Sequence, residues 1–297
     1  PVILWDDGLK VFSSSKFHHG ETLAEVDGNY YKNYHGKIYK TDAAGTITYD
    51  EAHHATNDKP LDFSITKNVF MIMVVFLIMF FMFSRMAKAY KKNGGMPKGM
   101  GRLLEPIILY IRDDIAIPNI GKDYRKYMGY LLTIFFFIWI VNLFGLTPLG
   151  VNVTNNIAIT FCLAFLTFLI TTFTGKKHYW LHIFDPLGNS MPWAGKIFLY
   201  ILLVPIEIIG MFVKPFSLMI RLFANITAGH IVIMSILGMI FISKNILGGT
   251  LSFALAFVLG ILELLVAALQ AYIFTMLSAL YFGAAAEEHD HEHEHAH

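Results

Sequence analysis

Residues 197–243 read IFLYILLVPIEIIGMFVKPFSLMIRLFANITAGHIVIMSILGMIFIS, an apolar block of 47 residues. As one α-helix, at about 1.5 Å per residue, it would be about 70 Å long, whereas the hydrocarbon core of a bilayer is about 30 Å thick. An upright helix does not fit, but a strongly tilted helix that bends near Pro205 and Pro215 does. The block therefore predicts a membrane protein built around a long, tilted helix.

A second long block follows and predicts a helical hairpin. Residues 250–283 are again mostly apolar, about 51 Å long as a helix, and the polar segment Ser243–Thr250 separates the two blocks. Upstream, residues 68–84 and the uncharged segments 127–146 and 157–174 are long enough to cross a bilayer. We therefore expect an all-α membrane protein with five membrane helices, the last two forming a strongly tilted hairpin.

The composition agrees with a membrane protein and excludes several other classes. Apolar residues make up 55% of the chain and charged residues 15%, against about 45–50% and about 25% in soluble domains. The net charge of +1 excludes a strongly basic nucleic-acid-binding protein. The single cysteine, Cys162, forms neither an internal disulfide nor a cysteine-based zinc site. Phosphate-binding and hydrolase motifs are absent, so we expect no catalytic residue, no metal and no cofactor.

The segment 100–120, between the first two spans, has the pattern of an interfacial helix. Its apolar residues recur at helical spacing, while its charged residues gather elsewhere around the helix. The apolar positions are Leu104, Ile107, Ile108, Ile111 and Ile115, and the charged ones are Arg112, Asp113 and Asp114. We expect this helix to lie on the membrane surface and not to cross it.

Residues 1–60 differ from the rest and are predicted to form a small extramembrane lobe. They contain six lysines, nine acidic residues and five histidines, without a long apolar run. Residues 37–49 alternate polar and apolar side chains around a turn-rich Asp-Ala-Ala-Gly, which predicts a β-hairpin. Residues 284–297 alternate acids and histidines, which is typical of a disordered tail, although weak metal binding stays open.

The placement of lysine and arginine predicts the orientation. These residues cluster at both ends of the loop between the first two spans, so that loop is expected in the cytoplasm. Alternation of the spans then places the N-terminus on the outer side of the membrane and the C-terminus in the cytoplasm. In chain order, the expected regions are the lobe (1–60), the first span and its loop (61–99), the interfacial helix (100–120), two spans (121–175), a loop and the tilted hairpin (176–283), and the tail (284–297).

Five titratable residues interrupt the last two apolar blocks and mark the expected functional site. They are Glu207, Lys214, Arg221, His230 and Glu263. A charge at the centre of a membrane helix costs about 2.5–3.5 kcal/mol, so such residues usually have a function. The first three recur every seven residues and so lie on one stripe of the helix. Counted from the middle of the connecting segment, His230 and Glu263 come to the same depth, where a His–Glu pair can relay protons.

Arg221 is the residue with the clearest functional implication. A guanidinium stays charged, and no acidic residue of the chain is expected near it, so another subunit is expected to supply the carboxylate. Asn225, one turn further along, stays near Arg221, and Gln270 lies at about the same level in the second block. Ordinary interhelical hydrogen bonds would explain both amides equally well. Lys214 is equally well explained by a side chain that reaches the membrane surface.

Several motifs resemble the a subunits of F-type ATP synthases, the stationary half of a proton-driven rotary motor. The most specific is Lys214-Pro-Phe-Ser-Leu-Met-Ile-Arg-Leu-Phe-Ala-Asn-Ile-Thr-Ala-Gly-His230. Leu269-Gln-Ala-Tyr-Ile-Phe274 is similar to the last-helix motif of this family, and residues 119–126 and 142–148 are similar to earlier segments. The resemblance covers about residues 100–283.

The resemblance implies a role for most of these polar residues. Arg221 would face the carboxylates of the rotating c-ring, with Asn225 and Gln270 as polar neighbours. His230 and Glu263 would line the external half-channel, in the arrangement of mitochondrial members.

The resemblance also implies a second half-channel and a set of partners. Glu207 would belong to the cytoplasmic half-channel. The partners would be the c-ring, the b-type subunits of the peripheral stalk, other ATP synthase subunits and membrane lipid, without nucleic acid. The lobe and the His-rich tail depart from the usual family pattern, and packing on stalk or accessory subunits is one open role for them.

Two other functions agree less well with the sequence. The His-rich tail suggests a metal transporter, but such a site needs several ligands within the spans, where only one histidine lies. A membrane-embedded hydrolase would need the nucleophile or metal motifs that are absent. The sequence leaves open whether the translocated ion is H⁺ or Na⁺.

Overall fold

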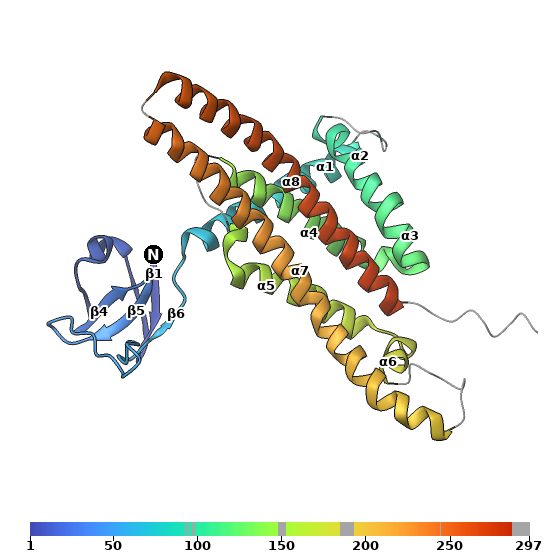
Figure 1. Cartoon of the computed structure of the whole chain (residues 1–297), viewed down its shortest axis with the longest axis horizontal. Helices are drawn as coiled ribbons and strands as arrows, with labels where there is room; N and C mark the ends of the chain where they lie inside the picture. Colours follow the sequence, from blue (N-terminus) through green and yellow to red (C-terminus); the bar gives the residue numbers. More distant parts are fainter. Residues whose placement is uncertain are drawn as a thin grey trace, which may run out of the picture. The chain divides into compact units, whose positions relative to one another are not determined.

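The computed structural model describes residues 1–92, 94, 96, 99–147, 153–184, 193–243 and 245–286. Parts of two predicted loops (148–152 and 185–192) and most of the predicted tail (287–297) lie outside the described residues. The chain divides into two compact units, Pro1–Phe70 and Met71–His297. The first is rich in β-strands, and the second is helical (Figure 1).

The first unit contains two antiparallel sheets of three strands each. One has the order β2–β1–β6 and the other the order β3–β4–β5. The 3-10 helix η1 (Ser14–Gly20) follows β2 in the chain. The strands are β1 (Val2–Trp5), β2 (Leu9–Phe12), β3 (Ala24–Val26), β4 (Asn29–Tyr34), β5 (Lys37–Thr41) and β6 (Leu61–Asp62).

The predicted β-hairpin is present in the lobe, but its strand pairing differs from the expectation. β5 pairs with the preceding β4, and not with residues 46–49. The reason is the turn at His35-Gly36, where φ is 48° and 75°, as the two-residue turns of hairpins require. The Asp-Ala-Ala-Gly segment forms a local turn instead, because Thr46 N donates a hydrogen bond to Asp42 Oδ1 at 2.8 Å.

A buried polar contact fixes the core of the first unit. Tyr31 is fully buried, and its hydroxyl donates to Asp6 Oδ2 at 2.7 Å. Lys40 Nζ lies 2.9 Å from the same carboxylate oxygen. The hydrogen bond from Tyr31, followed by that from Lys40, stabilises the carboxylate and lowers the pKa of Asp6 below its ordinary value.

We expect Asp6→Asn to destabilise the first unit at neutral pH by about 1–2 kcal/mol, because a charge-assisted hydrogen bond is lost at a partly exposed site. The lowered pKa makes this stabilisation fully present above the unfolded pKa of about 3.9, and it disappears as the pH falls through the folded pKa. In the full chain, backbone hydrogen exchange of β1 and β4 should be faster in the variant at pH 7, with a difference that shrinks towards pH 2. Identical exchange at pH 7 would contradict the assignment.

The helical part begins with α1 (Lys67–Lys92) and ends with α8 (Ile246–Ala286). Between them lie α2 (Met100–Tyr110), the π-helical η2 (Ile111–Ala116), α3 (Ile117–Ile120), η3 (Gly121–Asp123), α4 (Tyr124–Gly145), η4 (Val153–Asn155), α5 (Ile157–Thr174), α6 (Lys177–Phe184) and α7 (Trp193–Ser243). Among the residues that the structure describes, five helical stretches are long and apolar enough to cross a membrane: α1, 101–145, α5, 199–243 and α8. The predicted all-α fold with five membrane helices is thus confirmed.

The predicted interfacial helix, made of α2, η2 and α3, directly precedes the second span in the chain. It ends at Gly121, where φ is 71° and ψ is −137°, and η3 and α4 then follow. Its apolar side packs into the hydrophobic core, where Leu104, Ile111 and Ile115 are buried. Asp113 and Asp114 are exposed on its other side. The packing agrees with the predicted amphipathic pattern, while the position of this helix on the membrane surface stays a prediction.

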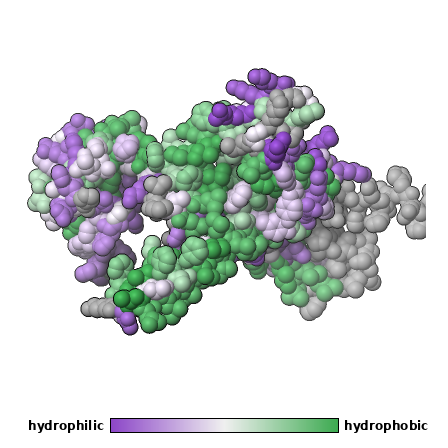
Figure 2. All heavy atoms as spheres, turned by 90° about the horizontal axis from the view of Figure 1, so that it is seen from above, coloured by the Kyte–Doolittle hydropathy of each residue, from purple (hydrophilic) through white to green (hydrophobic). Residues whose placement is uncertain are grey.

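The two last helices form the predicted long hairpin. α7 is a single helix of 51 residues, about 77 Å at 1.5 Å per residue, and it continues through Pro205 and Pro215. α8, with 41 residues, runs back beside it (Figure 1). Many large apolar side chains of both helices are exposed, as contact with lipid requires. Figure 2 shows large hydrophobic areas on the second, helical unit.

Candidate functional site

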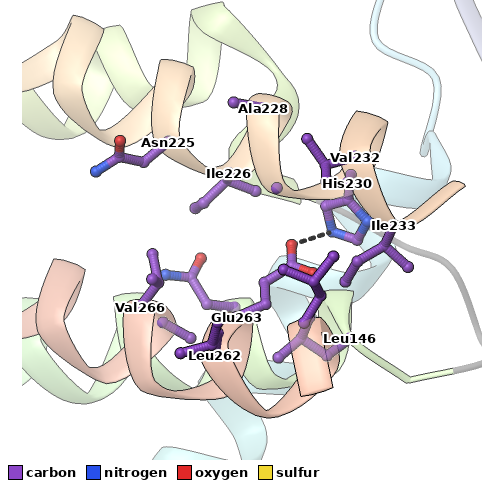
Figure 3. Close-up of a pocket in the computed structure, with 14 residues that line it drawn as sticks. Leu146, Asn225, Ile226, Ala228, His230, Val232, Ile233, Leu262, Glu263 and Val266 are labelled. Carbon is purple, nitrogen blue, oxygen red and sulfur yellow. Dashed lines mark ion pairs between the residues drawn. The ribbon is translucent and has the colours of Figure 1, made fainter. Parts of the chain in front are cut away.

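His230 on α7 and Glu263 on α8 face each other across the hairpin (Figure 3). Nε2 of His230 lies 3.8 Å from Oε1 of Glu263, within ion-pair distance but longer than a direct hydrogen bond. Both side chains are largely buried, with 24% and 10% of their surface exposed. The prediction that the two residues share one depth is confirmed.

Gly229 makes room for the carboxylate of Glu263. A Cβ atom at position 229 would lie 2.8 Å from Glu263 Oε1 and 3.1 Å from its Cδ. Any side chain at this position would therefore displace the carboxylate from its place beside His230. Sequence reasoning missed this role, since a glycine in a helix gives no signal of what packs against it.

The pair lines a cavity of about 300 Å³ between α7, α8 and the end of α4. The wall is mostly apolar, and its polar side chains are Asn142, Asn225, His230 and Glu263. Oε2 of Glu263 is buried and has no hydrogen-bond partner among the described residues. The cavity has room for several water molecules. A titratable pair, an open acceptor and space for water together suit the relay of protons.

Asn142 is a second site residue without a predicted role, although it begins the family-like segment 142–148. It is buried on α4, and its Oδ1 accepts a hydrogen bond from Thr154 Oγ1 at 3.0 Å. Its Nδ2 is buried without a partner among the described residues. The available signal was an amide within the uncharged span 127–146, but a search for titratable groups passes over it.

Arg221 has no ion pair with any acidic side chain that the structure describes, and it is exposed. Two contacts on either side fix its level in the hairpin: the His230–Glu263 pair, and Lys214 Nζ, which lies 5.7 Å from the ring centroid of Tyr281. Interpolation between these contacts places Arg221 opposite about residue 273. This level agrees with the predicted one.

The remaining predicted residues do not line this cavity. Gln270 is buried on α8, and its Nε2 has no partner among the described residues. Glu207 is half-buried on α7 and forms no ion pair with a described side chain. Lys214 contacts Tyr281 by a cation–π interaction. The cavity thus brings His230, Glu263 and Asn225 together with Asn142, whereas Arg221, Gln270 and Glu207 do not line it.

The part of the chain that the structure describes contains no group of three or more His, Cys, Asp or Glu side chains that could hold a metal ion. The histidines of the tail lie outside the described residues.

Comparison with known proteins assigns most of the chain to the family that its sequence motifs resemble. Residues 69–283 match the family described as ATP synthase A chain, and residues 1–63 match a Domain of unknown function (DUF8433). The chain is 44% identical to ATP synthase subunit a of Chloroherpeton thalassium over 234 residues, which are 77% of this chain and 69% of that protein.

Two further relatives extend the comparison. ATP synthase subunit a 2 of Chlorobaculum tepidum is 45% identical over 232 residues, 75% of this chain and 64% of the relative. ATP synthase subunit a of an Anaeromyxobacter species is 35% identical over 275 residues, 91% of this chain and 62% of the relative. The chain thus spans somewhat less than two thirds of the length of these two proteins. The similarity over the helical region shows that the chain belongs to the ATP synthase A chain family, the proton-translocating and non-catalytic a subunits of F-type ATP synthases.

Proposed function

We propose that this subunit holds two separate proton half-channels beside the c-ring, with His230 and Glu263 in the external one. The observation that carries the proposal is the His–Glu pair in a mostly apolar cavity, nine residues along α7 from an arginine without a described partner. Nine residues correspond to about 13 Å along a helix. The proton relay and the fixed positive charge are therefore separate sites on one helix.

The external half-channel would work by proton relay. A proton enters the cavity, binds to the His230–Glu263 pair, and passes through water, which the amides of Asn142 and Asn225 would orient by hydrogen bonds, to a carboxylate on the c-ring. The pair suits this role because an imidazole and a carboxylate can each bind and release a proton. The c-ring site, now neutral, moves through the lipid as the ring turns.

Arg221 would separate the two half-channels. Its permanent positive charge repels a proton that would cross directly, and it attracts each c-ring carboxylate that has lost its proton. Gln270 lies on α8 near the level of Arg221, and its Nε2 has no partner among the described residues. Its amide would orient the c-ring carboxylate beside Arg221. Glu207 lies fourteen residues from Arg221 on the other side, about 21 Å along α7, and would accept the released proton towards the cytoplasm. Lys214 would support this end of the helix through Tyr281.

The partners and the location follow from this function. The chain is a multi-pass membrane protein of an ATP synthase complex, and the c-ring and the b-type stalk subunits are the partners that we propose for it. The bacterial relatives support an inner-membrane location. The clusters of lysine and arginine support a periplasmic N-terminus and a cytoplasmic C-terminus.

Glu263→Gln tests the external half-channel. The substitution keeps the size of the side chain and removes its titration, so ATP synthesis driven by a proton gradient should fall by about 100-fold, the lower end of the range for a lost proton-transfer group. The measurement uses the intact complex in liposomes after an acid–base jump. Leu265→Gln, which adds the same amide at an exposed position of α8, is the control and should synthesise ATP at least half as fast as the parent. Synthesis by Glu263→Gln at the parent rate would exclude the proposed relay.

A further inference from the structure

The β2–β1–β6 sheet of the first unit has an apolar outward face as well as a mostly apolar inward face. Val2, Leu4 and Phe12 point inward and are buried in the core of the unit. The alternate positions point outward, since successive side chains of a strand lie on opposite faces. An antiparallel sheet with one face in water normally has polar residues at these outward positions. Here they are Ile3, Trp5, Leu9, Val11, Leu61 and Phe63, which we name the apolar sheet face.

The strand register makes these six side chains neighbours. Trp5 pairs with Leu9 on one side and with Leu61 on the other, and Ile3 pairs with Val11. Phe63 N donates a hydrogen bond to Ile3 O at 2.8 Å, which continues the same row. Ile3 is half-buried, whereas the other five side chains are exposed, from 55% of the surface for Trp5 to 63% for Phe63.

The second sheet of the same unit has an ordinary solvent-facing surface. Glu25 on β3 and Lys37 on β5 are exposed charged residues, whereas the apolar sheet face has no charged residue. The N-terminal unit accordingly shows both hydrophilic and hydrophobic areas in Figure 2. A large exposed apolar patch on one side only is typical of a contact surface.

The covalent connection indicates what this surface contacts. β6 ends at Asp62, and α1, a candidate membrane span, begins at Lys67. Four residues separate them, and fully extended they reach at most about 14 Å. Phe63 belongs both to this connection and to the apolar sheet face. The end of β6 is therefore tethered within about 14 Å of the start of a candidate span. The Trp and Phe side chains of the face have the chemistry that prefers the membrane–water interface.

We propose that the apolar sheet face rests in the interfacial region of the lipid bilayer from which α1 emerges, so that the lobe is a peripheral membrane anchor. The charged surface of the second sheet stays in water. This assignment is independent of the path that the protons take.

Spin labels can test the contact in the intact ATP synthase. In a Cys162→Ser background, one chain has Val11→Cys on the apolar sheet face and a matched control has Glu25→Cys on the other sheet. Each labelled complex is reconstituted into vesicles of phosphatidylethanolamine and phosphatidylglycerol. Relaxation of the label is then measured with oxygen, which concentrates in lipid, and with a water-soluble nickel chelate. ATP synthesis at the parent rate verifies that both labelled chains have folded and assembled.

We expect the label at position 11 to respond several-fold more to oxygen than to nickel, and the label at position 25 to show the reverse. Equal access of nickel to both labels would overturn the proposal, because the apolar sheet face would then lie in water. A label at position 11 that is shielded from both reagents would also overturn it, since another protein or a second copy would then cover the surface.

Discussion

Arg221→Ala is expected to reduce proton-driven ATP synthesis by at least about 100-fold, as the loss of one pre-positioned electrostatic group at a reacting site does in enzymes. The guanidinium has no acidic partner in the described part of its own chain, and it is exposed on the hairpin. Its proposed partner is a c-ring carboxylate. Without the positive charge, nothing would draw the deprotonated carboxylate into place, and nothing would repel a proton that crosses directly.

Synthesis and passive proton flux are both measured in liposomes that contain the variant complex. Arg112→Ala is the matched control, because Arg112 forms its ion pair with the adjacent Asp113, outside the hairpin, and should leave synthesis unchanged. Arg221→Lys keeps the charge but loses the planar fork of hydrogen-bond donors. Its rate of ATP synthesis should therefore lie between that of the parent and that of Arg221→Ala. Near-normal coupled synthesis by Arg221→Ala, at normal subunit levels, would refute the role of Arg221.

The hairpin and the His–Glu pair could be predicted because both depend on strong, local signals. A charge in a long apolar block is costly, so Arg221 and Glu263 stand out without any structure. The depth match between His230 and Glu263 follows from counting, since a short connection fixes the register of two antiparallel helices. The 3.8 Å distance and the level of Arg221 both agree with that count.

Other parts of the site depend on packing between distant segments, which leaves little trace in the sequence. Asn142 reaches the cavity only because α4 packs against the hairpin, and it is held by Thr154, twelve residues away. Gly229 matters only because Glu263 lies against it. In each case the role of the residue becomes visible only in three dimensions.

In the lobe, two strand pairings have a local sequence signal that was overlooked, and one pairing has no local signal at all. Asp7-Gly8 and Asp27-Gly28 have positive φ at both positions and connect successive strands, and Asp-Gly is a strong hairpin signal. Attention to these pairs would have located the β1–β2 and β3–β4 hairpins. The pairing of β6 with β1, by contrast, joins residues almost sixty positions apart and has no local signal.

Gly283→Ala is expected to lower the amount of assembled subunit by at least about fivefold, the range in which losses of stability change protein abundance. A methyl group at position 283 on α8 would overlap the backbone carbonyl oxygen of Asn119, at the contact between α8 and α3. Backbone atoms move only if the helices separate, and overpacking of this kind typically costs about 1–3 kcal/mol or more. The quantity of subunit a in purified complexes is the measurement.

Gly260→Ala on the same helix distinguishes a steric effect from a general effect of replacing glycine. Nothing lies within 4 Å of the added Cβ at position 260, so this change should only gain helix propensity, about 1 kcal/mol in favour of alanine. The same gain at position 283 acts against the expected loss, so a net loss there isolates the clash with Asn119. Because α3 ends the predicted interfacial helix, its separation from α8 would also disturb the segment that packs beside the hairpin. Equal amounts of subunit in the two variants would mean that α8 and α3 are not in close contact in the assembled complex.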